Sequence, residues 1–453
     1  MDLRRKRILV VGLARTGIAA ARFLHQRGAI VVATDHMLEG QLDPAIRELA
    51  EMGIGLELGG HRPESFTAAD FIVLSPGVPH TIAPLAAARQ RGVPVIGEME
   101  LAFRFIAEPI VAITGTNGKT TVTELVGAML AASGRRVFVG GNIGTPLISH
   151  AADGGRVDVV VVEISSFQLD TIETFRPAVG VLLNISDDHL DRYADFETYA
   201  ASKMRLFANR QSGDVAILNA DDPIIRDRAN GLRDRVLYFS RSEPAAAHAA
   251  IAGRTLTLRM PDRETIALGL DGFRLRGPHN LENAAAAALA ALAAGGTPAG
   301  LQTVLNTFAP RPHRLETIAS VNGVEYVNDS KATNVDAVRR GLESFSTPIV
   351  LIMGGVDKGG DFGLLRDLLR ERGRGLVLLG GAKQRIRAAL EAWVPTAEAA
   401  GMRQAVRAAA ALAAAGDVVL LAPGCASFDL YANYQERGED FRREVMRLTQ
   451  RDA

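Results

Sequence analysis

Short apolar runs recur along the chain, each followed by a turn rich in Gly, Pro, Ser or Asn and then by a segment with helical periodicity. Many runs are apolar at consecutive positions, which is typical of parallel strands buried on both faces. Their alternation with helices predicts α/β domains that bind ligands at the carboxyl ends of strands. The predicted strands are Arg7–Val11, Ile30–Thr34, Phe71–Leu74, Ile110–Thr114, Val137–Val139, Val157–Val162, Ala178–Leu183, Val215–Leu218, Pro348–Met353, Gly375–Leu379 and Asp417–Leu421.

The pattern divides the chain into three blocks. Three strand–turn units make up the first block, and an alanine-rich helix, Leu281–Ala294, ends the second. Short alternating pieces between Ser242 and Gly277 predict an antiparallel hairpin region within the second block. The proline-interrupted segment from Phe308 to His313 is interpreted as a linker to the third block. We expect the domains to cover residues 1–97, 98–310 and 311–453.

The composition is that of a globular protein. Hydrophobic residues make up 47% and charged residues 23% of the 453 positions, which excludes large-scale disorder. The 51 Lys and Arg residues balance 51 Asp and Glu residues, which argues against a nucleic-acid backbone or an anionic membrane surface as the main partner. The length suggests about two to four domains.

The chain also carries signs of its cellular compartment. Cys425 is the only cysteine, so the chain forms no intrachain disulfide and no cysteine zinc cluster, as is typical of a reducing compartment. The apolar run after the basic start ends at Gly12, which fits a first strand rather than a signal peptide. The most apolar helical stretch, Ala284–Ala294, is too short to cross a bilayer. We therefore expect a cytoplasmic protein with no membrane insertion.

The strongest local signal follows the predicted strand Ile110–Thr114. There the sequence reads Gly115-Thr-Asn-Gly118-Lys119-Thr120-Thr121, ahead of an amphipathic segment. Such a turn lets main-chain N–H groups surround phosphate oxygens at a helix N-terminus. Lys119 would neutralise the β- and γ-phosphates, and the Thr120 hydroxyl would ligate Mg²⁺. The alternative, a chance Gly-Lys-Thr-Thr in an ordinary turn, is disfavoured by the flanking strand and helix.

The first block carries a weaker nucleotide signal. Gly12-Leu-Ala14-Arg-Thr-Gly17 follows a strand, and Asp35 ends the next one. Because Ala14 replaces the middle glycine, this is a degenerate dinucleotide fingerprint. It is compatible with NAD, with another nucleotide diphosphate, or with a plain tight turn. The turn Ser75-Pro-Gly77 after the third strand would face the same crevice.

Polar turns also follow the strands of the second block. Glu163 and His189 come after buried strands that we expect beside the phosphate-loop strand, and Asn142 follows a Gly-Gly pair. An acid there can hold the Mg²⁺ of a nucleotide directly or through water, and a neutral imidazole can ligate a second cation. Each residue considered alone would be interpreted as a solvated loop residue. The expected convergence of these residues on one phosphate loop favours a metal site instead.

The third block adds cations in turns after strands. Arg314, Lys331 and Lys358 would together make a basic mouth suited to phosphate and carboxylate groups, with solvated surface cations as the alternative. Cys425 lies in another such turn. The sequence shows no base paired with it, so we interpret this thiol as structural.

Taken in order, these motifs closely resemble the Mur ligases of peptidoglycan precursor synthesis, and within that family the branch that adds D-glutamate. The resemblance covers nearly the whole chain, and SSFQL with NDSKATN is more specific than the phosphate loop alone. It implies an α/β protein with a Rossmann-like N-terminal domain for a UDP sugar, a central P-loop ATPase domain with a mostly parallel sheet, and a Rossmann-like C-terminal domain. The matching motifs are GTNGKTT, EISSFQLD, NISDDHLDRY, GPHN, PHR, NDSKATN, GGVDKGGDF and APGCASFD.

The resemblance also implies roles for single residues. The UDP sugar would be bound by Gly12, Leu13, Ala14, Arg15, Thr16, Gly17, Asp35, Ser75, Gly77, Asn142, Ser165 and Gln168. ATP would be bound by Gly115, Thr116, Asn117, Gly118, Lys119, Thr120, Thr121, Asn280, Arg314 and Asp329. The incoming amino acid would meet Thr333, Lys358, Ser427, Phe428 and Tyr434. Mg²⁺, as two ions, would be held by Thr120, Glu163, His189 and Lys203. The groups that act in catalysis would be Lys119, Glu163, His189, Lys203, Arg314 and Lys331.

The implied reaction joins D-glutamate to UDP-N-acetylmuramoyl-L-alanine in cell-wall synthesis, on which cell shape and division depend. A carboxylate is a poor electrophile, so the γ-phosphoryl group of ATP would first convert it to an acyl phosphate, which the amine then attacks. Positioning and charge neutralisation supply most of the acceleration in phosphoryl transfer, which fits a site of cations and metal without a Ser-His-Asp constellation. We expect small-molecule partners only, no nucleic acid, and a monomer.

Lys203 is the residue with the most divergent interpretations. Tyr199, Lys203 and Phe207 are spaced as on one face of a helix, so the lysine alone would pass for one whose stem covers apolar surface and whose ammonium reaches solvent. The resemblance implies instead that Lys203 is carbamoylated. Burial beside other cations favours the free amine, which can add CO₂, and the resulting anion can ligate Mg²⁺.

Several alternatives remain open from the sequence. The same ligation could use another amino acid such as L-glutamate, or the chain could be similar to a folylpolyglutamate synthase. An NAD-dependent oxidoreductase built on the first block is disfavoured by Ala14 and by the second phosphate loop. A non-catalytic nucleotide switch would have no use for the groups that follow the third-block strands.

Overall fold

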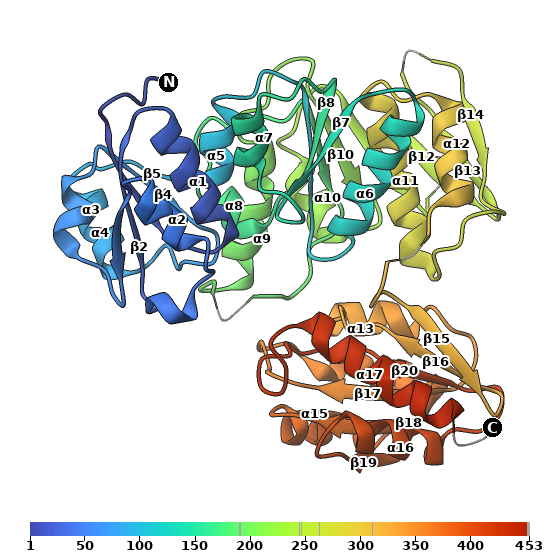
Figure 1. The fold of residues 1–453 in the computed structure, drawn as a ribbon. Helices are drawn as coiled ribbons and strands as arrows, with labels where there is room; N and C mark the ends of the chain where they lie inside the picture. The colour runs from blue at the N-terminus through green and yellow to red at the C-terminus, as the bar shows by residue number, and fades with distance from the viewer. Residues whose placement is uncertain (190–191, 244, 246, 262, 310, 451–453) are drawn as a thin grey trace. The chain divides into compact units, whose positions relative to one another are not determined.

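The computed structural model describes residues 1–450 apart from positions 190–191, 244, 246, 262 and 310. Within these residues the strands form three sheets (Figure 1). The chain divides into two compact units. The first unit contains Met1–Asn184, Tyr199–Gly269 and Ala284–Val304, and the second contains Ile185–Thr198, Leu270–Asn283 and Leu305–Ala453.

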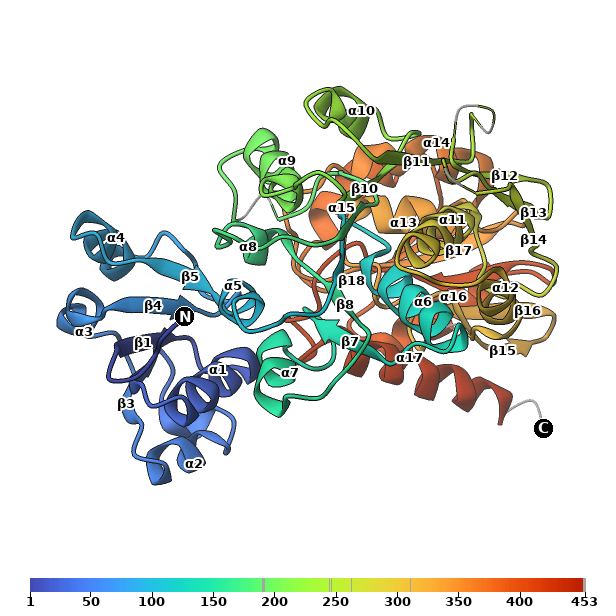
Figure 2. The same cartoon turned by 90° about the horizontal axis from the view of Figure 1, so that it is seen from above.

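The first sheet is parallel throughout, in the order β3-β2-β1-β4-β5. Its strands are β1 (Arg7–Val11), β2 (Ile30–Asp35), β3 (Gly55–Leu58), β4 (Phe71–Leu74) and β5 (Val95–Gly97). Its helices are α1 (Arg15–Gln26), η1 (Glu39–Gln41), α2 (Ile46–Glu51), α3 (Pro63–Ala68), α4 (Ala83–Gln90) and α5 (Glu98–Phe103). Helices α3 and α4 pack on one face of the sheet, and α1 and α2 lie on the other (Figure 2).

The prediction of three strand–turn units in the first block is wrong, because two strands were missed. β3 is only partly buried along its length and β5 has three residues, so neither shows the continuous apolar run of a central strand. Both are edge strands whose pairing depends on the three that the pattern identified.

The second sheet also lies in the first unit and has nine strands, in the order β14-β13-β12-β11-β10-β9-β6-β8-β7. They are β6 (Ile110–Thr114), β7 (Val137–Gly141), β8 (Val159–Glu163), β9 (Val179–Leu182), β10 (Val215–Asn219), β11 (Val236–Ser240), β12 (Ala249–Ala252), β13 (Thr255–Leu258) and β14 (Ile266–Gly269). Only the last three pair in antiparallel fashion, which confirms the predicted hairpin region. The parallel strand β11 was not predicted.

Helices lie between the parallel strands of this sheet, and others follow its last strand. They are α6 (Lys119–Ala132), α7 (Leu147–Asp153), α8 (Ser166–Leu169), α9 (Phe196–Met204), η2 (Arg205–Phe207), α10 (Pro223–Ala229), α11 (Pro278–Ala293) and α12 (Pro298–Thr307). Helix α11 begins three residues before the predicted start, with proline at a helix N-terminus where its missing N–H costs nothing. Asn280 therefore lies in the first turn of a helix.

The third sheet belongs to the second unit, in the order β15-β16-β20-β17-β18-β19. Its strands are β15 (Glu316–Val321), β16 (Val324–Asn328), β17 (Ile349–Gly354), β18 (Gly373–Leu379), β19 (Thr396–Glu398) and β20 (Val418–Leu421). Its helices are α13 (Val335–Leu342), η3 (Phe362–Leu365), α14 (Arg366–Arg372), α15 (Lys383–Leu390), α16 (Met402–Leu412) and α17 (Tyr434–Thr449). All pairs are parallel except β15 with β16. Three strands of this sheet, β15, β16 and β19, were not predicted.

Strand β17 shows why its sequence is apolar at successive positions. Leu351 and Met353 pack in one apolar cluster, under helices α13 to α15, whereas Val350 and Ile352 pack in a second cluster under α16 and α17. Both faces of the sheet are covered, so every position of the strand is buried. The predicted α/β class with mostly parallel sheets is confirmed.

Candidate active site

The predicted phosphate loop joins β6 to α6, as expected. Gly118 caps the helix in the left-handed region at φ +85°, and Gly115 has φ +154°. A Cβ at Gly115 would lie 2.9 Å from the Cβ of Leu183 on the neighbouring strand, so the loop needs glycine on steric grounds as well. The local conformation is that of an anion-binding turn at a helix N-terminus.

Two lysines converge on this loop. The Lys119 Nζ donates to the carbonyl oxygens of Gly115 and Thr116, both at 2.9 Å. The Lys203 Nζ donates to the same Gly115 oxygen at 2.9 Å and lies 4.6 Å from the centre of the Tyr199 ring. Lys203 is 1% exposed, so the interpretation of this residue as a lysine reaching solvent is wrong.

The helix predicted through Lys203 ends earlier than its spacing suggested. α9 stops at Met204, and Arg205–Phe207 form a tighter 3₁₀ turn. The Arg205 guanidinium donates to the carbonyl oxygens of Leu169 and Ile172 at 2.8 and 2.7 Å, which ties this turn to the segment after α8. Tyr199, Lys203 and Phe207 are nevertheless all buried.

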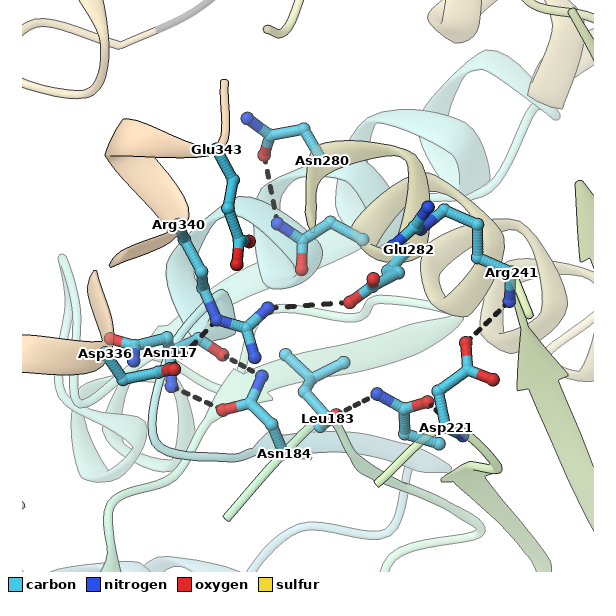
Figure 3. A network of polar contacts seen from close by, with 12 residues as sticks. Asn117, Leu183, Asn184, Asp221, Arg241, Asn280, Glu282, Asp336, Arg340 and Glu343 are labelled. Atoms are coloured by element: carbon cyan, nitrogen blue, oxygen red, sulfur yellow. Dashed lines mark hydrogen bonds and ion pairs between the residues drawn. The ribbon is translucent and has the colours of Figure 1, made fainter. Parts of the chain in front are cut away.

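Asn184 holds the middle of the phosphate loop and was missed from the sequence. Its side-chain oxygen accepts the Asn117 N–H at 2.8 Å, and its Nδ2 donates to the Asn117 carbonyl at 3.0 Å (Figure 3). The Thr116 hydroxyl lies 3.0 Å from the Tyr199 hydroxyl. Asn184 begins NISDDH directly after an apolar run, and that position was the available signal.

Glu163 ends β8, beside the phosphate-loop strand. It is 2% exposed, and its two carboxylate oxygens accept from the Thr120 hydroxyl and from the Asn142 Nδ2, both at 2.7 Å. A hydroxyl and a carboxylate side by side at a phosphate loop are the oxygen ligands that Mg²⁺ takes together with phosphates and water, so these residues fit that ion. Thr121 lies one residue further into α6 and is buried.

The residues predicted to hold Mg²⁺ are divided between the two units. Thr120, Glu163 and Lys203 belong to the first unit, and His189 belongs to the second. Within the described part of the chain, no group of three or more His, Cys, Asp or Glu side chains is arranged to hold a metal ion. His189 has φ +57°, an uncommon conformation for a residue other than glycine.

The predicted UDP-binding turn lies between β1 and α1. The Leu13 N–H donates to one oxygen of Asp35 at 2.7 Å, and the Ser75 hydroxyl donates to the Gly12 carbonyl at 2.7 Å. A Cβ at Gly17 would overlap that carbonyl, so glycine is required where the helix approaches the turn. The N-terminus of α1 has no acidic residue in its first turn and no side-chain cap. Its first main-chain N–H groups can therefore bind an anion.

The remaining members of this predicted set have different surroundings. Ala14 is the N-cap of α1, Arg15 and Gly77 are exposed, and Thr16 is half-buried. Ser165 and Gln168 form a capping box at α8, in which the Ser165 N–H donates to Gln168 Oε1 at 2.9 Å and the Gln168 N–H donates to Ser165 Oγ at 3.3 Å. The SSFQL motif thus has a helix-capping function of its own.

In the second unit, the Asp329 and Lys331 turn meets helix α17. The Lys331 Nζ lies 4.2 Å from the centre of the Tyr434 ring, so this aromatic residue contacts a lysine. Burial raises the pKa of the Asp329 carboxyl to about 7, against the opposing effects of the Leu315 N–H and the Arg314 charge. His313 and Leu315, which flank Arg314, both have positive φ, at 65° and 45°.

Arg437 of α17 connects the turn that contains Ser330 with the turn that contains Cys425. This residue was not identified from the sequence. Its guanidinium donates to the Ser330 carbonyl at 2.8 Å, the Ser330 hydroxyl at 3.0 Å and the Cys425 carbonyl at 3.1 Å. Arg437 is 1% exposed, and burial lowers its pKa to about 10. Burial also raises the pKa of the Cys425 thiol to about 12, which supports a structural residue rather than a nucleophile.

The predicted amino-acid site shows a paired lysine. The Lys358 Nζ lies 3.4 Å from an oxygen of Asp188, and the other oxygen of Asp188 accepts from the Asn334 Nδ2 at 3.0 Å. Thr333, just before Asn334, is half-buried. Ser427 is buried, whereas Phe428 beside it is 74% exposed.

Asn280, predicted to lie near the adenine, belongs to a polar network in the second unit (Figure 3). Its oxygen accepts from Asn283 Nδ2 at 3.0 Å, and its own Nδ2 donates to the Arg276 carbonyl at 2.6 Å. Nearby, Arg340 pairs with Asp336 at 2.9 Å and with Glu282 at 3.5 Å (Figure 3). Burial lowers the pKa of His279 to about 3, so its imidazole is neutral.

The chain is similar to known proteins over nearly its whole length. Three family models match the chain: the Mur ligase MurD-like N-terminal domain over residues 6–97, the Mur ligase middle domain over 113–291, and the Mur ligase glutamate ligase domain over 313–425. Curated relatives named UDP-N-acetylmuramoylalanine–D-glutamate ligase match over almost full length. The protein from Desulfosudis oleivorans is 49% identical and covers 100% of this chain and 98% of its own, and that from Desulfatibacillum aliphaticivorans is 50% identical and covers 99% and 100%.

Solved structures share the fold at lower identity. A pseudomurein peptide ligase type C from Methanothermus fervidus has a TM-score of 0.63 at 21% identity and covers 98% of this chain and 100% of its own. MurF ligase from Thermotoga maritima in complex with ADP has a TM-score of 0.63 at 16% identity and covers 99% and 96%. With three matching domain models and full-length relatives near half identity, the chain belongs to the Mur ligase family and groups within it with the UDP-N-acetylmuramoylalanine–D-glutamate ligases.

Proposed function

We propose that this chain is an ADP-forming ligase that adds D-glutamate to UDP-N-acetylmuramoyl-L-alanine, with ATP and Mg²⁺. The observation that carries the proposal is the phosphate loop with Lys119, set directly beside the Thr120–Glu163 pair in a chain of this family. The names of the relatives that match over almost their full length support the choice of substrates.

The phosphate loop would activate the substrate carboxylate. Phosphoryl transfer from ATP converts that poor electrophile into an acyl phosphate, and Mg²⁺ supplies charge neutralisation while bound. In the described conformation the Lys119 ammonium donates hydrogen bonds to two carbonyl oxygens of its own loop. It would leave them for the phosphate oxygens, where a fixed cation stabilises the charge that spreads over the transferring group. Arg314 and Lys331 would add positive charge at the same phosphates.

Two further regions would hold the other substrates. The Gly12–Gly17 turn, with Asp35 and Ser75 fixing its shape, would bind the UDP moiety at the start of α1. Thr333, Lys358, Ser427 and Phe428 would bind glutamate, and Lys358 would exchange its contact with Asp188 for a substrate carboxylate. Asn280 would lie near the adenine, and Asp329 near the ribose.

We further propose that Lys203 carries a carbamate. It is buried, and its nitrogen shares the Gly115 oxygen with Lys119. Two cations aimed at one acceptor favour loss of one charge, and a neutral amine can add CO₂. The carbamate would be an anion able to hold a second Mg²⁺ with His189.

The wider assignments are proposals too. We place the domains at residues 1–97, 98–310 and 311–453, and we propose a cytoplasmic monomer. No helix among the described residues has the length and apolar character needed to cross a membrane.

One assay tests the activity. The protein is supplied with ATP, Mg²⁺ and UDP-N-acetylmuramoyl-L-alanine, and phosphate release is measured against a panel of D- and L-amino acids. We expect release with D-glutamate well above all other members. Preference for L-glutamate or for a folate substrate would replace the proposed acceptor, and binding of NAD with no phosphate release would contradict a ligase.

A further inference from the structure

Asn142 is attached to Glu163 at two points. Its main-chain N–H donates to the Glu163 carbonyl at 2.9 Å, and its side-chain Nδ2 donates to Glu163 Oε1 at 2.7 Å. The donor end of the amide, its nitrogen, therefore faces the carboxylate. One residue therefore fixes both the main chain and the carboxylate of Glu163.

The turn before Asn142 is shaped for this contact. β7 pairs with β8 in a register that sets Gly141 opposite Glu163. Gly141 has φ +97°, and a Cβ there would overlap the Glu163 carbonyl oxygen. The Gly141 N–H donates to the Thr145 carbonyl at 2.9 Å, which closes the turn. Glycine at position 141 thus lets the strand end come close enough for the amide to reach the acid.

The second oxygen of Glu163 points to the phosphate loop. Oε2 accepts from the Thr120 hydroxyl at 2.7 Å, and the side chain is buried. A neutral amide on Oε1 fixes the rotation of the carboxylate without placing a positive charge beside the proposed cation, as a lysine or arginine would. Groups that orient a ligating carboxylate affect metal affinity strongly, by about 10–100-fold when removed.

We propose that Asn142 is a positioning residue that holds the Glu163 carboxylate in the orientation needed to bind a divalent cation at the phosphate loop. This role is additional to any contact of Asn142 with the UDP sugar. It rests on the proposed function in one respect, that Glu163 binds the metal.

The test measures Mn²⁺ binding to the full-length protein in the presence of ADP, without UDP sugar and without turnover, by electron paramagnetic resonance of free Mn²⁺. We expect Asn142→Ala to weaken Mn²⁺ binding by about 10-fold or more. Asn209→Ala is the matched control, because Asn209 donates to the main-chain oxygens of Glu173 and Phe175 and touches neither Thr120 nor Glu163. This control should keep wild-type affinity for Mn²⁺.

A double-mutant cycle shows whether Asn142 acts through the acid. Glu163→Gln should weaken Mn²⁺ binding, and adding Asn142→Ala to it should cause little further loss. Unchanged binding in Asn142→Ala, or an equal loss in both backgrounds, would overturn the positioning role. Unchanged binding in Glu163→Gln would instead overturn Glu163 as a metal residue. Circular dichroism establishes folding, and Asn142→Ser, whose side chain is too short to replace the amide, repeats the test if the alanine variant is unfolded.

Discussion

Two ammonium groups share one carbonyl oxygen in the phosphate loop. The nitrogens of Lys119 and Lys203 both lie 2.9 Å from the Gly115 oxygen, and Lys203 is buried. Two positive charges that share one acceptor repel each other, and more strongly where water is excluded. Negative charge brought by a nucleotide at Lys119, or by carbamoylation at Lys203, would remove this repulsion.

Lys119→Ala tests the phosphate loop. Removing the cation that would meet the transferring phosphoryl group should lower kcat on the order of 10²-fold or more. Lys383→Ala is the control, since this lysine pairs with Glu398 on the surface of the second unit and should leave kcat unchanged. Steady-state phosphate release gives both values, and wild-type turnover in Lys119→Ala would remove the assignment of the loop.

Lys203→Arg tests the carbamate. Arginine keeps the positive charge but cannot add CO₂, so we expect a folded protein that has lost most of its activity. The wild type should also lose activity in buffer stripped of CO₂ and regain it with bicarbonate, whereas the arginine variant should respond to neither. Full activity of Lys203→Arg would show that no carbamate is needed.

Glu98 makes the stability of the protein depend on pH. It is fully buried at the start of α5, one of its oxygens accepts the Ile148 N–H at 2.6 Å, and burial raises its pKa from 4.5 to about 7. The folded state holds the proton of the Glu98 carboxyl more tightly than the unfolded state does. This difference stabilises the folded state in full below pH 4.5, and the stabilisation is lost as the pH rises through about 7.

Glu98→Gln should remove this dependence. A pKa difference of this size corresponds to about 3 kcal/mol of unfolding free energy. From acidic to alkaline buffer, the wild type should therefore lose up to that much more stability than the variant. Urea unfolding of both proteins at pH 5 and pH 8 measures the change. A constant difference between them would mean that Glu98 does not titrate in this range.

At the scale of elements, the candidate groups lie where parallel strands end. Asp35 ends β2, Glu163 ends β8, and Asp329 and Asn184 follow β16 and β9 within two residues. Parallel strands bring their carboxyl ends to one edge, and the N-termini of the following helices meet there too. Glycines such as Gly17 allow helix and turn to approach closely enough.

Gly17→Ala tests that approach. The added methyl would overlap the Gly12 carbonyl, so α1 must move away from the turn, and we expect a loss of about 1–3 kcal/mol in stability with a raised KM for the UDP sugar. Gly40→Ala is the control, because nothing lies within 4 Å of its added Cβ. Denaturant midpoints measure the stability of both variants, and KM values measure their use of the UDP sugar. Equal behaviour of both variants would contradict a close helix–turn contact.

The continuous apolar runs were predicted correctly as strands, whereas the edge strands β3, β5, β15 and β19 and the internal strands β11 and β16 were missed. Continuous apolar runs such as Ile349–Gly354 need helices on both faces, and that demand is visible in the sequence. β3, β5 and β19 are short or partly exposed, and they become strands only by pairing with a neighbour. Local sequence carries little information about such pairing.

At the scale of the whole molecule, the proposed substrate groups are distributed over both units. The UDP-sugar turn, the phosphate loop, Glu163 and Lys203 belong to the first unit, whereas His189, Arg314, Lys331 and the amino-acid residues belong to the second. The proposed reaction needs an amine and an acyl phosphate in contact, so we expect the units to close on the substrates.

Small-angle scattering tests this closure. We expect the radius of gyration to fall when an ATP analogue and UDP-N-acetylmuramoyl-L-alanine are both present, and less with either alone. The ADP complex without UDP sugar provides the reference state. A radius of gyration that is the same in all states would contradict closure.

The α/β class, the phosphate loop, the hairpin region and the family can all be read from the sequence, because each depends on local pattern or on motifs carried by contiguous residues. The environments of single side chains, in contrast, depend on the folded structure. Lys203 is buried and donates to Gly115, Asn142 is attached to Glu163 at two points, and Arg437 donates to Ser330 and Cys425. The residues of these pairs are between 12 and 107 positions apart in the chain. Such contacts arise from strand order and helix packing, and the spacing of residues along the chain does not contain them.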